Sequence, residues 1–318
     1  MENSSNQAGR PVPEKQWQLV EKVVLESVRE HRLARRWGIV FKGLTFLYLF
    51  AALMLFAPLW QAGPLLADDE HVAVVRVSGV IAEGKPAAAG NVIRGLTAAF
   101  ESDALAVIMA INSPGGSPVH SDQVFREARR LRALHDKPLI AVIDDMGASG
   151  AYYMAAAADE ILADKASLVG SIGVVSGGFG FVDTLEKLGV ERRMFTAGAH
   201  KGMLDAFSPL KEDETEFWQQ VLATTHQQFI ARVQEGRGDR LVDQPEIFSG
   251  LIWSGQQALE LGLIDGFSSV RELARERFDT TELIDYTPRQ SPFQALLGVA
   301  AGSLSQALVE QAATPTLR

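Results

Sequence analysis

Apolar and polar positions form long blocks along this chain, and three of the apolar blocks have the length of buried strands. They are Val72–Ile81, Ala104–Ile111 and Leu139–Ile143. Between the last two, apolar residues recur at helical spacing from Val124 to Leu134. Continuous apolar strands separated by a helix are typical of parallel strands covered on both faces. The pattern therefore predicts an α/β domain.

Shorter elements are predicted after the third strand. They are a helix over 151–158, a strand over 160–163, strands and tight turns over 167–181, a helix over 184–188, a strand over 190–196, a loop over 197–202, and a strand, a turn and a helix within 247–265. A long helix is expected from Glu212 to Val233, because its acidic first turn suits the helix dipole. This domain should occupy residues 61–290. A further amphipathic helix is expected over residues 291–318.

The N-terminal part of the chain has a different pattern. Residues 1–36 form a basic tail, in which Trp17, Val20, Val24 and Val28 predict an amphipathic helix. Residues 37–60 follow, and no residue is charged from 43 to 60, close to the ~20 apolar residues that span a bilayer. A cleaved signal peptide is the alternative, but the basic lead is too long for one. We therefore predict a transmembrane signal anchor.

Charge sets the expected orientation of this anchor. Arginines precede the span and acidic residues follow it at 68–70, so the positive-inside rule places the N-terminus in the cytoplasm and the large domain outside. The whole chain has a net charge of −9, which argues against a nucleic-acid surface. The absence of cysteine excludes thiolate metal sites, and the glycines do not form a nucleotide-binding GxGxxG motif before a helix.

A corner of small residues follows the third strand and carries one hydroxyl group. The sequence there is Gly147-Ala148-Ser149-Gly150, and good helix formers come next. A serine at the start of a helix lies beside unpaired backbone N–H groups, which can stabilise an oxyanion. Ser149 is thus either a simple N-cap or a nucleophile.

Two other groups of small residues interrupt apolar segments, at 113–117 and 198–202. Glycine there lets backbone N–H groups approach a ligand closely. The Ser-Pro-Gly-Gly sequence at 113–116 could supply one oxyanion donor and Gly150 a second. These residues would form an acyl-transfer site if a base reached Ser149.

The spacing of residues along the chain does not by itself identify that base. A Ser-His-Asp hydrolase is possible, since residues 147–151 nearly match GxSxG and Asp183 could join His200 or His226; His120 is a third candidate. A lysine can act only if desolvation lowers its pKa from ~10.4 towards ~7–8. Lys201, among small residues with no adjacent carboxylate, is better placed for this than Lys165, Lys187 or Lys211.

Five ordered motifs resemble the signal peptide peptidase A (protease IV) family of Ser-Lys serine peptidases, in its short, single-unit form. They are SPGG at 113–116, GASGAYYMAAAAD at 147–159, VGSIGVVSG at 169–177, HKGMLDAFSPL at 200–210 and GLIWSGQQALELGLID at 250–265. The resemblance implies that Ser149 is the nucleophile and Lys201 the general base. It also implies an oxyanion hole at Gly116 and Gly150, and a hydroxyl at Ser171 that orients the lysine. Ala151 departs from the family, which usually has glycine there.

The resemblance also implies a Clp protease/crotonase-like fold of repeated ββα units, here preceded by one transmembrane helix. It implies a peptidase domain outside a bacterial cytoplasmic membrane, on the periplasmic side. The expected substrates are signal-peptide remnants or other apolar peptides, with no metal or organic cofactor, and the expected assembly is a ring-like homo-oligomer that shares sites between subunits. A non-catalytic membrane scaffold that binds peptides and an acyl-CoA enzyme of the crotonase type are the alternatives.

Overall fold

A computed structural model of the chain describes residues 22, 36–53 and 70–288. It divides into two compact units, residues 1–63 and 64–318. In the first unit, the helix Arg36–Leu53 is long and apolar enough to cross a bilayer, with a mean hydropathy of 1.3. Several predicted segments lie outside the described residues: the amphipathic helix within 1–36 except for residues 22 and 36, the helix over 291–318, and the end of the span at 54–60.

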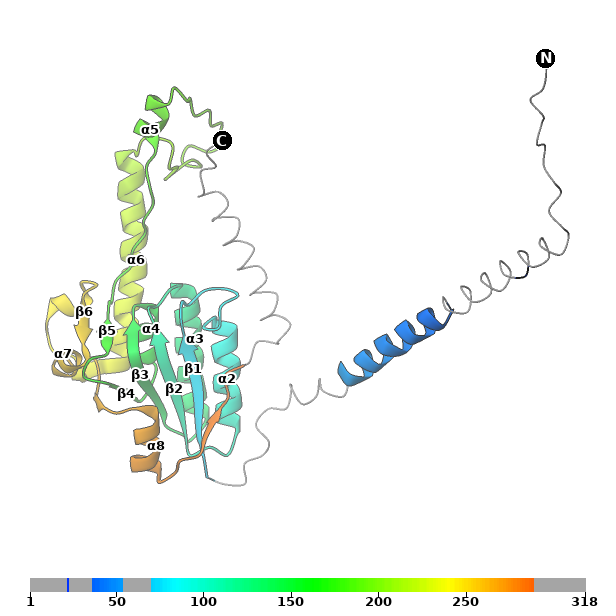
Figure 1. Cartoon of the computed structure of the whole chain (residues 1–318). Helices are drawn as coiled ribbons and strands as arrows, with labels where there is room; N and C mark the ends of the chain where they lie inside the picture. The colour runs from blue at the N-terminus through cyan, green and yellow to red at the C-terminus, as the bar shows by residue number, and fades with distance from the viewer. Residues whose placement is uncertain (1–21, 23–35, 54–69, 289–318) are drawn as a thin grey trace, which may run out of the picture. The chain divides into compact units, whose positions relative to one another are not determined.

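The second unit is built on a mixed sheet whose central strands are parallel (Figure 1). The central strands are β1 (Val72–Ser78), β2 (Ala106–Ser113) and β3 (Leu139–Ala148). Five shorter strands complete the sheet: β4 (Glu160–Ala163), β5 (Leu168–Gly170), β6 (Ile252–Ser254), β7 (Gly266–Phe267) and β8 (Leu283–Asp285). The main order is β6-β5-β3-β2-β1-β8, and β6 alone pairs in the antiparallel sense. The predicted α/β class is confirmed.

Alternate side chains of each central strand point to opposite faces of the sheet, and each face is covered by an apolar layer. On one face, Val75, Met109 and Ala141 lie in a large core that also receives α2 (Ala89–Glu101), α3 (Pro118–Leu134) and α4 (Gly150–Ala155). On the other face, Ile108 and Ile140 lie in a smaller apolar cluster that is covered by α8 (Val270–Phe278). They are aligned across the sheet with each other and with Val74. The strands read as unbroken apolar runs because both of their faces are buried.

The third strand changes partners along its length. Residues 140–143 pair with β4, whereas residues 146–148 pair with β5, and the register with β2 shifts between Ile111 and Ser113. The second half of β3 thus has neighbours different from those of its first half. The strand therefore delivers Ser149, the next residue, to a corner between two sets of neighbours.

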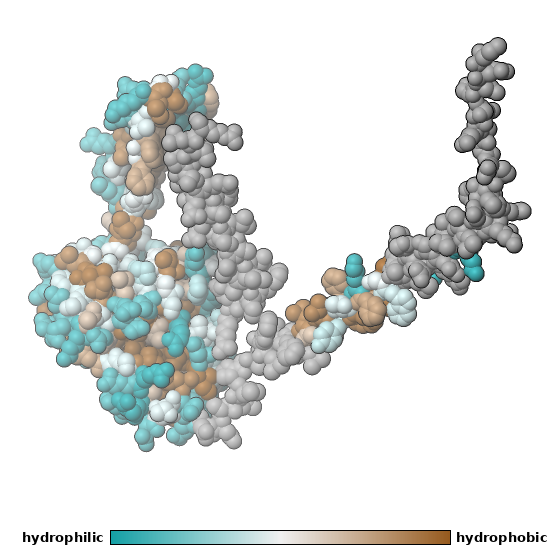
Figure 2. Space-filling view, viewed as in Figure 1, coloured by the Kyte–Doolittle hydropathy of each residue, from teal (hydrophilic) through white to brown (hydrophobic). Residues whose placement is uncertain are grey.

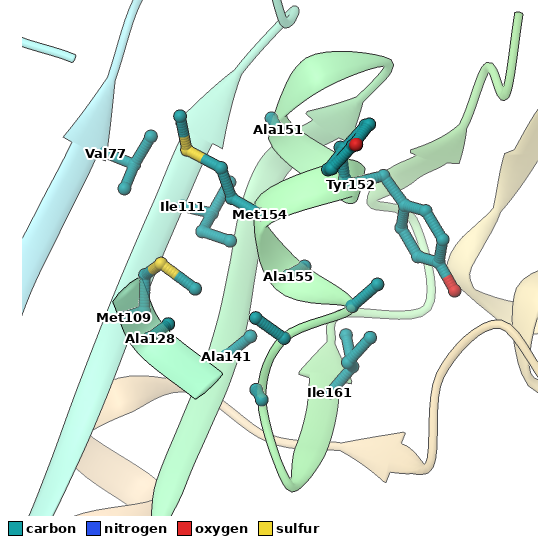
Figure 3. Close-up of a cluster of buried hydrophobic side chains, with 14 of the residues drawn as sticks. Val77, Met109, Ile111, Ala128, Ala141, Ala151, Tyr152, Met154, Ala155 and Ile161 are labelled. Carbon is teal, nitrogen blue, oxygen red and sulfur yellow. The ribbon is translucent and has the colours of Figure 1, made fainter. Parts of the chain in front are cut away.

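Helix α4 is short and wholly buried, and small residues make this possible. Ala151, Tyr152, Met154 and Ala155 are each 0% exposed. Figure 3 shows them packed among side chains of β1, β2, α3 and β4, including Val77, Ile111 and Ile161. Ala151 thus fills a core position rather than widening a surface pocket.

Residues 173–225, which we call the arm, extend away from this core (Figure 1). The arm contains α5 (Val182–Lys187), the loop after it and the first half of α6 (Glu212–Arg237). Between residues 173 and 228, all of which are described, Glu214 is the single buried residue. Large apolar side chains are exposed here instead, with Val175 at 91% and Phe195 at 94%, and Figure 2 shows apolar surface over the arm.

The other end of α6 is fixed in the body. A β-carbon on Gly236 would lie 1.9 Å from the carbonyl oxygen of Ala156, so only glycine lets α6 approach α4 so closely. The next residue, Arg237, is buried and forms hydrogen bonds of 2.7 and 2.9 Å with both carboxylate oxygens of Asp265. The remaining elements after α6 are η1 (Gly238–Arg240), η2 (Pro245–Phe248) and α7 (Gly255–Glu260).

One prediction of local structure is wrong and a second is confirmed only at its start, and the parts that fail lie mainly on the arm. Residues 190–196 form no strand, and between 167 and 181 only 168–170 do. Residues such as Val190 and Phe195 have side chains that favour strands, but within one chain this segment has no neighbouring strand. The helix α8 and the strand β8 are additional elements that the apolar pattern did not predict.

Candidate active site

Ser149 occupies a strained turn between β3 and α4. Its backbone has φ 53° and ψ −123°, a region that residues with side chains rarely adopt. The turn is held on both sides, because the Ser149 N–H donates to the Gly170 carbonyl at 2.8 Å and its carbonyl accepts from the Tyr153 N–H at 3.0 Å. The hydroxyl makes no cap hydrogen bond to the helix. Ser149 therefore does not act as a simple N-cap, and its geometry is that of a nucleophile elbow.

The Ser-Pro-Gly-Gly segment lies directly against this turn. A β-carbon on Gly115 would fall 2.8 Å from the β-carbon of Ser149, and one on Gly150 would fall 3.3 Å from the Gly116 nitrogen. Within the part of the chain that the structure describes, neither the Gly116 nor the Gly150 N–H donates to a protein group. Two free donors beside a serine hydroxyl are the components of an oxyanion hole.

Glycine at position 116 is required by the backbone around it. Its φ is 148°, and a β-carbon would meet the Ile81 carbonyl oxygen at 2.2 Å. This contact arises because Ile81 and Gly116 form a parallel bridge, with the Ser117 N–H donating to the Ile81 carbonyl at 2.8 Å. The bridge holds the SPGG segment against the end of β1 and fixes the direction of the Gly116 N–H.

We expect Gly116→Ala to lower acyl transfer at Ser149 by at least about tenfold and to lower the melting temperature, because the added methyl must push residues 115–117 away from Ile81. Gly79→Ala is the control, since a β-carbon at Gly79 also sits at positive φ but meets nothing within 4 Å. Thermal unfolding and acyl transfer would be measured on both variants. Equal activities for the two variants would contradict a role for the Gly116 position.

Ser171 is the second predicted hydroxyl, and it lies next to the Ser149 turn. Pairing of β3 with β5 aligns Ala148 with Gly170, so the residues that follow, Ser149 and Ser171, leave the two strands side by side. Ser171 also has a positive φ of 52°, and its N–H donates to the Leu251 carbonyl at 2.8 Å. Two strained serines thus stand at the same end of adjacent strands.

Lys201 lies apart from these residues within a single chain. It is exposed in the loop after α5, and its neighbour His200 lies 3.6 Å from Glu214 on the first turn of α6. Tyr153, one turn after Ser149, stacks on Phe229 with ring centroids 4.8 Å apart. Glu214 and Phe229 are fifteen residues apart on one straight helix, which is about 22 Å at 1.5 Å per residue. The structure therefore brings together Ser149, Gly116, Gly150 and Ser171 but not Lys201.

The histidines considered as alternative bases have other positions. His120 Nδ1 accepts a hydrogen bond from the Ala89 N–H at 3.0 Å, and His226 Nε2 lies 3.0 Å from the Ile172 carbonyl oxygen. His200 and Asp183 are both on the arm, far along the chain from the Ser149 turn. Within residues 70–288, no contact joins Ser149 or Asp183 to His120, His200 or His226.

An ion cluster lies one helical turn behind Ser149, and two of its residues, Asp122 and Arg232, belong to none of the five sequence motifs. The Tyr153 hydroxyl donates to Asp122 at 3.0 Å, and Arg232 Nε donates to the same carboxylate at 3.1 Å. Burial alone would raise the pKa of Asp122, but the hydrogen bonds from Tyr153 and Arg126 and the charge of Arg232 hold it below its usual value. Burial, with the Asp122 carboxylate, raises the pKa of Tyr153 to about 12.

Other candidate sites lie elsewhere or are not formed. A shallow cavity of about 520 Å³ lies at the opposite end of α3, lined by Arg129, Arg132, His135 and Lys137 among others. Among residues 22, 36–53 and 70–288, no three histidine or acidic side chains gather as metal ligands would. In the described part of the chain, the Ser149 corner is thus the place where an uncapped serine hydroxyl and free backbone donors coincide.

These features define an α/β protein with a strained serine and an adjoining pair of backbone donors, and sequence comparisons identify its family. Residues 132–283, which include Ser149, Ser171 and Lys201, match the sequence model of peptidase family S49. A Synechocystis protein described as a protease is 33% identical over 197 residues, which cover 62% of this chain and 69% of that protein. The chain belongs to peptidase family S49, and the resemblance read from the motifs is confirmed.

Other relatives share the same region within longer proteins. The chloroplastic serine protease SPPA of Arabidopsis thaliana is 32% identical over 69% of this chain and 34% of its own length. A Brucella abortus protein named as the Na⁺/H⁺ antiporter NhaA is 42% identical over 67% of this chain. The chain spans about a third of the length of these relatives, 30% in the Brucella protein. The names of those relatives describe longer proteins, of which this chain matches only a part.

Among solved structures, the membrane-bound stomatin-specific protease 1510-N in complex with a substrate peptide is similar over 74% of this chain and 99% of its own. The TM-score is 0.47 and the sequence identity 14%.

Proposed function

We propose that this protein is a membrane-anchored serine endopeptidase in which Ser149 attacks the peptide bond and Lys201 of a neighbouring subunit acts as the general base. The observation that carries the proposal is the Ser149 turn, with its positive φ, uncapped hydroxyl and two adjoining free N–H groups. Membership of a peptidase family supports acyl transfer as the chemistry of this turn.

In the proposed mechanism, the neutral amine of Lys201 removes the proton of the Ser149 hydroxyl as its oxygen attacks the carbonyl carbon of the substrate. The resulting oxyanion accepts hydrogen bonds from the Gly116 and Gly150 N–H groups. Collapse of the tetrahedral intermediate expels the amine, which takes the proton back from Lys201. A water molecule, deprotonated by Lys201, then hydrolyses the acyl-enzyme. Ser171 would orient the incoming lysine through its hydroxyl.

Two observations favour a lysine from another subunit. First, α6 separates the Lys201 loop from the Ser149 turn of the same chain by about 20 Å. Second, the arm exposes several large apolar side chains, including Val175, Phe179 and Phe195, and exposed apolar patches mark interaction surfaces. Packing of the arm against a second copy would cover this surface and would also remove Lys201 from water, which a lysine base requires. The proposed assembly is a ring of such copies.

The proposed substrates are signal-peptide remnants or other apolar peptides outside the cytoplasmic membrane. The helix Arg36–Leu53 supports an anchor next to such substrates. Small and apolar residues surround the Ser149 turn, among them Gly115, Ala148 and Gly170, and they suit an extended backbone that approaches closely. The proposed compartment is the periplasmic side of a bacterial inner membrane.

A labelled fluorophosphonate probe tests the proposed nucleophile. It should label the full-length protein in detergent, because activated serine hydroxyls react with such probes, and Ser149→Ala should abolish the label. Ser268→Ala is a matched control, since Ser268 is a partly exposed serine whose hydroxyl bonds only the neighbouring Ser269 carbonyl. No labelling of a correctly assembled protein would favour the alternative of a non-catalytic scaffold that binds peptides.

The proposed orientation predicts that alkaline phosphatase fused after residue 270 is active in cells, because this enzyme folds only outside the cytoplasm. A fusion after residue 36, before the apolar helix, should be inactive. Both fusions would be measured in membrane fractions. An inactive fusion after residue 270 that still reaches the membrane would reverse the orientation.

A further inference from the structure

Helix α6 connects two parts of the proposed site, and its direction is fixed at one end only. Its buried residues are Phe229, Val233, Gly236 and Arg237 in the second half, whereas the first half has only Glu214. The Lys201 loop is attached at the first turn through His200 and Glu214. The helix can therefore act as a lever. Its base is the buried second half, which is fixed in the body, and its tip is the first turn, which contacts the Lys201 loop.

Three helices meet at the base of this lever in one cluster. Asp122 of α3 accepts hydrogen bonds from Tyr153 of α4 and from Arg232 of α6, both at its Oδ1 atom. The Arg232 guanidinium also lies over the ring of Phe125 on α3, 5.2 Å from its centroid. Phe229 of α6 stacks on Tyr153. Each helix thus makes both a polar and an aromatic contact, and together these fix the tilt and the rotation of α6.

The geometry makes the site sensitive to this cluster. Arg232 and Glu214 are eighteen residues apart on α6, or about 27 Å. A tilt of about 2° at Arg232 would therefore move the tip by about 1 Å, and an error of that size in a reacting group can cost on the order of 100-fold in rate. Tyr153 belongs to the buried helix α4, so the cluster anchors the base of the lever in the core of the body.

We infer that Asp122, Tyr153 and Arg232 are positioning residues that aim Lys201 at the neighbouring subunit. Their effect acts through the chain that donates the lysine, not through the chain that donates the serine. This inference rests on the proposed function, since it requires that the two residues come from different chains.

The test uses mixed oligomers, in which the two effects can be separated. A Ser149→Ala chain can donate only Lys201, and a Lys201→Ala chain can donate only Ser149. Arg232→Gln is placed first on the lysine-donating chain and then, in a second mixture, on the serine-donating chain. We expect the first placement to lower the recovered kcat at least tenfold with KM unchanged, and the second to change kcat less than twofold.

Two further variants complete the experiment. Arg130→Gln is the control, because Arg130 pairs with Glu127 on the outer surface of α3 and does not contact α6; it should have no effect in either placement. Asp122→Asn keeps the side-chain shape, so it replaces Arg232→Gln if that chain does not assemble, with the same expected difference between placements. Melting temperatures of each chain would be measured in parallel.

The outcomes separate this inference from the proposed function. Equal losses in the two placements would mean that the cluster only stabilises the fold, and they would overturn the inference while leaving the shared site intact. Absence of activity in the mixture without Arg232→Gln would overturn the shared site itself, and the inference with it.

Discussion

Replacing Ser149 or Lys201 by alanine is expected to lower peptide hydrolysis by roughly 10⁴- to 10⁶-fold, because nucleophile and base act as one unit in acyl transfer. Lys201→Arg should be as inactive as Lys201→Ala, since a guanidinium group keeps its proton in a protein and cannot accept the serine proton. Hydrolysis of a fluorogenic apolar peptide by the purified oligomer would measure these effects. Size and melting temperature would show that each variant is folded.

Two variants on the arm serve as controls for Lys201. Lys187 is an exposed lysine near the end of α5, so Lys187→Ala should retain nearly full activity. His200→Ala removes the residue next to Lys201 and breaks its contact with Glu214, and it should cost much less than Lys201→Ala. If His200→Ala is as damaging as Lys201→Ala, a Ser-His mechanism becomes the better explanation.

The central sheet could be predicted from the sequence because burial leaves a simple pattern. The strands at 72–78, 106–113 and 139–148 are apolar at nearly every position, since alternate residues enter two different cores. The strand predicted over 190–196 failed for a related reason. Val190 and Phe195 are residues that favour strands, but both are exposed on the arm. Apolar residues at these positions therefore do not mean that the segment is buried within its own chain. The pattern there is explained if a neighbouring subunit covers the arm.

The parts of the candidate site that follow from local chemistry were also predictable. A serine between a strand and a helix, with glycine beside it, gives the turn at Ser149, and the need for close backbone approach gives Gly116. Residue spacing could not predict that Lys201 lies far from Ser149 of the same chain, because this depends on the direction of α6 relative to the body. It was the family resemblance that implied a site shared between subunits. That direction depends on contacts such as Arg232 with Asp122, which are 110 residues apart in sequence and belong to no motif.

Mixing two inactive variants is expected to restore activity if the site is shared between subunits. Ser149→Ala chains retain Lys201, and Lys201→Ala chains retain Ser149, so a junction between the two kinds can contain both residues. In randomly mixed rings about a quarter of all junctions would be complete in this way. The prediction follows from the length of α6 between the Lys201 loop and the Ser149 turn, about 22 Å along one chain, and it is specific to a shared site.

The two proteins would be dissociated, combined in equal amounts and reassembled, and peptide hydrolysis would be compared with that of each variant treated alone. Native mass spectrometry would establish that mixed rings form. A Ser149→Ala/Lys201→Ala double variant mixed with wild type is the control for dilution, because it adds no new working junctions. If mixed rings form and hydrolysis stays at the level of the separate variants, the serine and lysine must pair within one chain. In that case α6 would have to change its direction to bring Lys201 back to Ser149 of the same chain.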